Sequence, residues 1–253
     1  VFNKDRPDIV VNATAYTSVD LAEKNVDECY AVNAFAPEHI AKACEEIHAL
    51  CIHISTDYVF DGLNSNPYVE NDCVSPTGVY GESKLAGENA LIGACSKYII
   101  LRTSWVFGFH GNNFLKTMIN VAENRSIISV VSDQIGAPTS SYGIANAIIS
   151  IINQTSNGNY GWGIYHYSGY PFTSWYGFAD AIFTEAKKLN LLHNPITLNA
   201  ITSEQYKTQA KRPKNSRLNC NKIKLQFKIE PDNWLLQMRL VLADIKSQKN
   251  EPV

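Results

Sequence analysis

The chain has 253 residues, of which 45% are apolar and 18% are charged, and its formal net charge at pH 7 is -2. This length and composition predict a globular protein with a sizeable core and exclude an intrinsically disordered chain. The near-neutral charge and the lack of a basic run exclude general electrostatic binding of nucleic acid or of an anionic membrane surface.

The six cysteines contain no C-x-x-C pair, and the longest apolar runs are far shorter than the roughly 20 residues that span a bilayer. Cysteines of this kind are typical of buried apolar side chains or of free thiols in a reducing compartment. We therefore expect a cytoplasmic protein with neither a membrane nor a nucleic acid as partner.

Short apolar runs alternate with amphipathic segments along the first half of the chain. In chain order they predict a strand at 8–13, a helix at 28–47, a strand at 51–55, a helix at 79–91, a strand at 98–102 and a helix at 113–124. This alternation indicates an α/β fold with a doubly wound parallel sheet. The later pattern is looser, with a strand at 164–167, a helix at 174–189 that opens on a serine cap, and a closing helix at 233–246.

Tyr80 and Lys84 are four residues apart in a predicted helix, so the phenol and the ammonium share one face. A free phenol titrates near pH ~10, and a nearby cation brings its pKa toward neutrality by stabilising the phenolate. Lysine also donates several hydrogen bonds, which suits it to holding the hydroxyls of a cofactor ribose. The spacing alone is weakly specific, because an exposed lysine beside a half-buried tyrosine produces the same pattern.

Thr56 follows the predicted buried strand at 51–55. In doubly wound folds, ligands bind outside the carboxyl ends of the strands, so this hydroxyl can orient a substrate carbonyl toward the phenol. A hydroxyl at a strand end can equally satisfy backbone groups, and Thr56 by itself does not decide between the two.

Three segments carry a family resemblance, namely STDYVFDG at 55–62, YGESKLAGE at 80–88 and RTSWVFG at 102–108. They resemble the extended short-chain dehydrogenases/reductases, and more narrowly the dTDP-4-dehydrorhamnose reductase family. Further matching segments follow the family order over nearly the whole chain, at 12–20, 111–114, 133–139 and 211–218.

The resemblance implies reduction of dTDP-4-dehydro-L-rhamnose to dTDP-L-rhamnose with hydride from NADPH or NADH, in dTDP-rhamnose biosynthesis. Tyr80 would donate the proton to the C4 oxygen, Lys84 would hold the nicotinamide ribose, and Thr56 would orient the carbonyl. The family positions that line the cofactor fall on Ala15, Tyr16, Thr17 and Ile54, and those that contact the sugar nucleotide fall on Asp57, Trp105 and Arg212. A guanidinium at Arg212 would offer paired donors to the diphosphate.

The sequence departs from the family at its start. The glycine-rich loop that holds the pyrophosphate should precede Asp8, and it is not there. The glycine-rich segment 158–163 comes late in the chain and predicts a turn. We therefore expect a fragment of a longer protein, with a Rossmann-like sheet that lacks its first strand and loop. Residues 1–108, with part of 140–170, would bind the dinucleotide, and residues 109–253 would form mainly a smaller substrate-binding lobe.

Metal sites are not predicted with any specificity. His48, Cys51 and His53 match no metal-binding spacing, and structural roles explain them better. Some reductases of this family are described as magnesium-dependent, and Glu185 and Asp244 are then candidate ligands. Solvated helix faces explain these two carboxylates as well.

Two alternatives remain beside the reductase. One is a nucleotide-sugar epimerase of the same superfamily, and the other is a non-catalytic subunit resembling the regulatory subunit of methionine adenosyltransferase. The segment 102–105 favours the reductase, because Trp105 supplies an aromatic platform for a sugar. A homodimer is compatible with the sequence, which leaves the oligomeric state and the choice between NADPH and NADH open.

Overall fold

The computed structural model describes residues 2–192 and 194–250, and these form two compact units. The first unit contains residues 2–103, 147–167 and 208–230, and the second contains the described residues of 104–146, 168–207 and 231–250. From the sequence, residues 109–253 are expected to form mainly the smaller, substrate-binding lobe. The segment 208–230 lies instead in the first unit, because Tyr68 pairs with Leu218 and exchanges backbone hydrogen bonds with Arg217 and Asn219.

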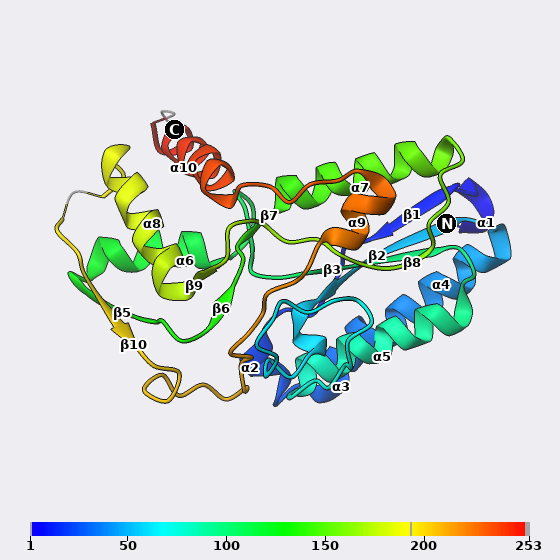
Figure 1. Cartoon of the computed structure of the whole chain (residues 1–253), viewed down its shortest axis with the longest axis horizontal. Helices are drawn as coiled ribbons and strands as arrows, with labels where there is room; N and C mark the ends of the chain where they lie inside the picture. The colour runs from blue at the N-terminus through cyan, green and yellow to red at the C-terminus, as the bar shows by residue number, and fades with distance from the viewer. Residues whose placement is uncertain (1, 193, 251–253) are drawn as a thin grey trace. The chain divides into compact units, whose positions relative to one another are not determined.

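The first unit is built on a parallel sheet (Figure 1). Its four strands lie in the order β1 (Ile9–Asn12), β2 (Leu50–Thr56), β3 (Tyr98–Thr103) and β8 (Gly163–His166). The two central strands, β2 and β3, are almost wholly buried, which explains their continuous apolar runs. The predicted α/β fold with a parallel sheet is thereby confirmed.

Helices cover both faces of this sheet. On one face lie α4 (Ala36–Ile47) and α5 (Val79–Ala94), and on the other lie α9 (Asn221–Phe227) and the part of α7 (Ser141–Ser156) from residue 147 onward (Figure 1). The helix predicted at 28–47 is divided into α3 (Val26–Tyr30), a π-helical turn η1 (Ala31–Phe35) and α4. Short elements complete the unit, namely α1 (Phe2–Asp5), α2 (Val19–Ala22) and the 3-10 turn η2 (Asp57–Val59).

The second unit packs its helices around an apolar core of its own. The helices are α6 (Phe114–Asn124), α8 (Trp175–Lys188) and α10 (Trp234–Asn250). The strands form three pairs, which are β5 (Ile127–Val131) with β10 (Thr197–Ile201), β4 (Val106–Phe107) with β7 (Thr139–Ser140), and β6 (Ile135–Gly136) with β9 (Thr173–Ser174). Ser174 caps α8 as predicted, since its Oγ accepts from the Gly177 N–H at 3.0 Å.

Within the described residues, no helix combines the length and the apolar character that crossing a membrane would require.

Candidate active site

The carboxyl end of β2 brings Thr56 to the helix that carries Tyr80 and Lys84. Thr56 is the last residue of β2, and Tyr80 stands in the first turn of α5. The Thr56 hydroxyl donates to Asp57 Oδ1 at 3.1 Å and accepts from the Tyr58 N–H at 3.2 Å, and Thr56 lies near enough to the Tyr80 phenol to lower its pKa. The three residues that the sequence singled out therefore meet at the strand end where doubly wound folds bind their ligands.

Tyr80 is a protonated phenol in this environment. Burial of the phenol raises the pKa of Tyr80 to about 12, while the nearby Thr56 side chain lowers it and the Asp57 carboxylate raises it further. The sequence had predicted that Lys84 would lower this pKa. In the structure the lowering contribution comes from Thr56 instead.

Lys84 is buried and held by β2. Its Nζ donates to the Ile54 carbonyl at 2.7 Å and lies 3.2 Å from His53 Nε2. Burial lowers the pKa of Lys84 to about 8, and the nearby Glu88 carboxylate partly offsets this effect. An ammonium has three N–H donors, so among the described residues these two contacts leave one donor for a further acceptor.

His53 is the site residue that the sequence reasoning missed. It was set aside as a structural residue, yet its ring faces the Lys84 ammonium. Because an ammonium can only donate, Nε2 accepts and the neutral ring carries its proton on Nδ1. Burial, with the Lys84 charge, lowers the pKa of His53 well below its usual value. The sequence feature that could have indicated this role is the position of His53, a polar residue inside a strand buried on both faces, three residues before Thr56.

A cofactor rich in oxygen atoms fits this end of the sheet. His53 Nδ1 and Asn12 Nδ2, which stand opposite each other in the β1–β2 register, are buried and have no hydrogen-bond partner among the described residues. Both are donors, and the free N–H of Lys84 is a third. Such a group of unpaired buried donors is costly unless an acceptor such as a ribose hydroxyl satisfies it.

Asn33 ties the segment after β1 to α5, and this role was also missed. Its side chain accepts from the Tyr16 N–H at 2.8 Å and donates to the Tyr16 carbonyl at 3.1 Å. It also donates to Ser83 Oγ at 3.1 Å, and Ser83 bonds the Tyr80 carbonyl at 2.9 Å. Asn33 lies in the π-helical turn η1, a distortion that is frequent at functional sites. It thus positions the 15–17 segment that was predicted to line the cofactor.

Two residues predicted to contact the sugar nucleotide lie in the first unit. Asp57 is buried beside Thr56, and burial raises the pKa of Asp57 to about 6 against the lowering effect of hydrogen bonds from Ser216 and Thr56. Arg212 is partly exposed and pairs with Asp20, with 2.8 Å between Nη2 and Oδ2. Its Nε has no partner among the described residues, so the guanidinium retains donor capacity.

Trp105 belongs to the second unit. Its backbone has a positive φ of 49°, which is strained for a bulky residue and is found mostly where function requires it. The ring stacks on Trp175, with 3.7 Å between the ring centroids. Gly136 lies so close to the indole that a Cβ there would come within 2.6 Å of it. The indole is therefore held in one orientation by its neighbours.

The acidic residues considered as magnesium ligands do not form a cluster. Glu185 pairs with Lys188 at 2.8 Å and with Arg239 at 3.1 Å, and Asp244 is exposed. In the part of the chain that the structure describes, no three His, Cys, Asp or Glu side chains come together as a metal site would need.

Comparisons with known proteins identify the family of this chain. Residues 1–247 match the family model described as the RmlD substrate binding domain. A curated dTDP-4-dehydrorhamnose reductase of Aggregatibacter actinomycetemcomitans is 46% identical over 244 residues, which cover 96% of this chain and 83% of that protein. The chain belongs to the dTDP-4-dehydrorhamnose reductase family.

Solved structures of the dTDP-4-dehydrorhamnose reductase family share the fold over nearly the whole chain. The enzyme from Clostridium acetobutylicum has a TM-score of 0.89 at 35% identity, covering 97% of this chain and 83% of that one. The enzyme from Bacillus anthracis, solved in complex with NADP, has a TM-score of 0.87 at 36% identity, covering 96% and 83%. This chain thus spans about four fifths of the length of these family members.

The burial of Asp57 leads to a prediction about stability. The folded chain keeps this carboxyl protonated up to about pH 6, whereas an unfolded aspartate loses its proton near pH ~3.9. The folded state therefore binds more protons between these values, and stability falls as the pH rises through this window. Asp57→Asn should consequently be more stable than the wild type at pH 7, by at most about 3 kcal/mol.

Thermal melting of both proteins at pH 7 and at pH 4 measures this effect. The advantage of the variant should disappear at pH 4, where the wild-type carboxyl is protonated in the folded state. A variant that melts at or below the wild-type temperature at pH 7 would mean that the fold stabilises ionised Asp57.

Proposed function

We propose that this chain reduces the 4-keto group of dTDP-4-dehydro-L-rhamnose to give dTDP-L-rhamnose, with hydride from NADPH or NADH, in dTDP-rhamnose synthesis. The observation that carries the proposal is the meeting of Thr56, Tyr80 and Lys84 at the carboxyl end of β2. The names of the family members and the NADP complex of one of them support it.

Each residue of the site would have a separate role in the reduction. Bound NAD(P)H supplies the hydride to C4 of the sugar. When the substrate binds, the Thr56 hydroxyl would turn its single O–H from Asp57 Oδ1 to the C4 oxygen and orient the carbonyl toward Tyr80. As negative charge develops on that oxygen, the Tyr80 O–H donates its proton, so the carbonyl gains one hydride and one proton and becomes an alcohol. A phenol with a pKa of about 12 is fully protonated at neutral pH, and its phenolate is a weaker base than the alkoxide that the phenol protonates.

Lys84 would hold the cofactor. Its remaining N–H suits a ribose hydroxyl of the nicotinamide nucleotide. The unpaired donors of His53 and Asn12, together with Ile54 and the segment 15–17, would surround the cofactor. In this assignment the first unit binds the dinucleotide.

Asp57, Trp105 and Arg212 are the residues proposed to contact the sugar nucleotide. Asp57 offers an acceptor to sugar hydroxyls, and Arg212 offers paired donors to the diphosphate. We further propose a cytoplasmic location, which suits the six free thiols.

Consumption of NADPH with the keto sugar tests the proposal and separates it from its alternatives. A reductase oxidises one nicotinamide for each sugar reduced. A nucleotide-sugar epimerase converts the sugar without net oxidation of the nicotinamide, and a non-catalytic subunit does neither. Stoichiometric loss of nicotinamide absorbance, with dTDP-L-rhamnose as product, is the expected result in the full-length protein.

Trp105→Ala should weaken binding of the sugar nucleotide about tenfold and leave cofactor binding nearly unchanged, because the variant removes one aromatic contact to the sugar. Calorimetric titration of each ligand measures the two affinities separately. Trp162→Ala is the matched control, since Trp162 is a partly buried tryptophan of the first unit whose ring contacts Tyr160 at a tilt, with 5.4 Å between the ring centroids. Loss of cofactor affinity with unchanged sugar affinity would show that Trp105 serves the cofactor instead.

A further inference from the structure

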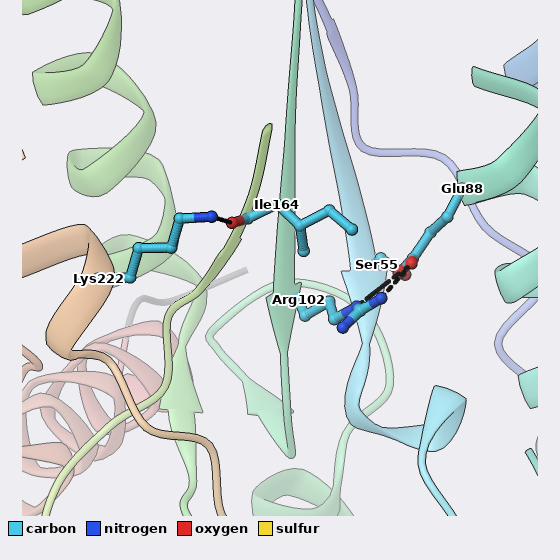
Figure 2. Close-up of polar contacts among 5 residues, drawn as sticks. All are labelled: Ser55, Glu88, Arg102, Ile164 and Lys222. Carbon is cyan, nitrogen blue, oxygen red and sulfur yellow. Dashed lines mark hydrogen bonds and ion pairs between the residues drawn. The ribbon is translucent and has the colours of Figure 1, made fainter. Parts of the chain in front are cut away.

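A buried carboxylate lies one helical turn beyond Lys84. Glu88 reaches from α5 to the sheet, where Ser55 on β2 and Arg102 on β3 bind it (Figure 2). Ser55 Oγ lies 2.5 Å from Oε1, Arg102 Nε lies 3.0 Å from Oε1, and Arg102 Nη2 lies 2.6 Å from Oε2. The three residues are at most 3% exposed, so the cluster is sealed from solvent.

Stability alone does not account for such a cluster. Taking two charges out of water is costly, and a buried ion pair is often no more stabilising than apolar side chains of similar volume. What the ion pair supplies is geometry, because a bidentate guanidinium and a hydroxyl fix the carboxylate in one place. The cluster therefore sets how α5 lies against β2 and β3.

The cluster and the catalytic residues lie on the same two elements, the helix α5 and the strand β2. Glu88 follows Lys84 by four positions on α5, so the two side chains share a face of the helix. Ser55 stands on β2 between Ile54, whose carbonyl holds the Lys84 ammonium, and Thr56. A shift of α5 along β2 would therefore displace Lys84 and Tyr80 from Thr56 together.

We propose that Glu88 is a positioning residue of the reductase site, which fixes Lys84 against β2 through Ser55 and Arg102 and supplies the buried negative charge that balances the ammonium. The proposal rests on the function proposed above. In the sequence, Arg102 belongs to the segment 102–105 that favours the reductase over its alternatives. In the structure its guanidinium binds Glu88.

The charged groups around Lys84 explain why Glu88 is expected to affect the pKa of Lys84. Burial lowers the pKa of Lys84 to about 8, and Glu88 and Cys29 are the groups whose charge opposes this effect. The His53 ring is neutral, and Tyr80 is protonated, so neither supplies a negative charge near pH 8. Without Glu88 the pKa of Lys84 should fall by about one unit, because a unit charge one turn away acts through a weakly polar interior.

The test is the double variant Glu88→Gln/Arg102→Met, which removes the ion pair without leaving a lone buried charge. We expect it to melt cooperatively near the wild-type temperature. The side-chain amine resonance of Lys84, assigned with Lys84→Arg, should then titrate about one pH unit lower than in the wild type. In parallel, the alkaline limb of the kcat/KM profile should move down by the same amount, so that activity at pH 8 falls several-fold.

Lys222→Met is the matched control. Lys222 is a cation that hydrogen-bonds the same sheet, since its Nζ donates to the Ile164 carbonyl of β8 at 2.8 Å. It does not contact Ser55, Glu88 or Arg102 (Figure 2). Its loss should leave the Lys84 titration and the pH profile unchanged. An unchanged Lys84 titration in the Glu88/Arg102 double variant would overturn the proposal. A wild-type protein that does not reduce the keto sugar would instead refute the proposed function, and the magnetic resonance titration would still test the positioning of Lys84.

If the double variant does not fold, Ser55→Ala replaces it. This variant removes the 2.5 Å contact and keeps the ion pair. We expect a melting temperature close to the wild type with kcat about tenfold lower, and restored kcat in Ser55→Thr, which retains the hydroxyl. Full activity in Ser55→Ala would overturn the positioning role.

Discussion

Tyr80→Phe is expected to lower turnover by at least about a hundredfold and to leave the fold intact. The variant removes only the O–H that would protonate the C4 oxygen, and the phenylalanine ring keeps the edge contact with Tyr58, whose ring centroid lies 5.3 Å away. Steady-state turnover of the keto sugar with NADPH measures the loss, and cooperative melting checks the fold.

Tyr58→Phe is the natural control, because it removes a phenol O–H from the same pair of rings without touching the proposed proton donor. Its turnover should stay within a few-fold of the wild type. Wild-type turnover in Tyr80→Phe would rule out Tyr80 as the proton donor. Equal losses in the two variants would mean that the Tyr58 hydroxyl matters as much as the Tyr80 hydroxyl, and the assignment of Tyr80 as the proton donor would lose its support.

Gly87→Ala is expected to destabilise the protein by about 2 to 3 kcal/mol and to weaken cofactor binding. A Cβ at position 87 would lie 2.0 Å from the Asn33 carbonyl oxygen, so α5 and the turn η1 are in contact at their backbones. Moving them apart would break the hydrogen bonds of Asn33 to Tyr16 and Ser83. Chemical denaturation gives the free energy of unfolding, and titration with NADPH gives the affinity.

Gly93→Ala provides the matched control on the same helix. A Cβ at Gly93 meets no atom within 4 Å, so alanine there should be neutral or stabilise the helix by roughly 0.5 to 1 kcal/mol. If both variants were equally stable, the close approach of α5 to η1 would not be needed for the fold.

The strands of the first unit and its helix α5 could be predicted because their apolar pattern is local, whereas α1, α2, α7 and α9 were not predicted. The strands β2 and β3 are continuous apolar runs, and the bounds expected for them differ from the structure by one residue. The meeting of Thr56 with α5 could also be predicted, since parallel strands end at one edge of the sheet. These predictions needed only the neighbouring residues and the general rules of the fold.

What could not be predicted depends on contacts between distant segments. Asn33 looks like any polar residue in an amphipathic helix until η1 places it against Tyr16 and Ser83. His53 looks like a buried strand residue until α5 brings Lys84 to its ring. The short strands β5 and β10 pair across some seventy residues, and neither is long enough to carry a pattern of its own.

The path of the chain between the two units has a consequence for how such enzymes can change. The chain passes from one unit to the other at 103/104, 146/147, 167/168, 207/208 and 230/231. A single cut therefore releases neither unit whole, and a single crossover between two related genes cannot exchange one unit for another. A new sugar preference in this architecture would have to arise by individual substitutions, for example at Trp105, which we propose to contact the sugar, while the rest of the polypeptide is inherited as one piece.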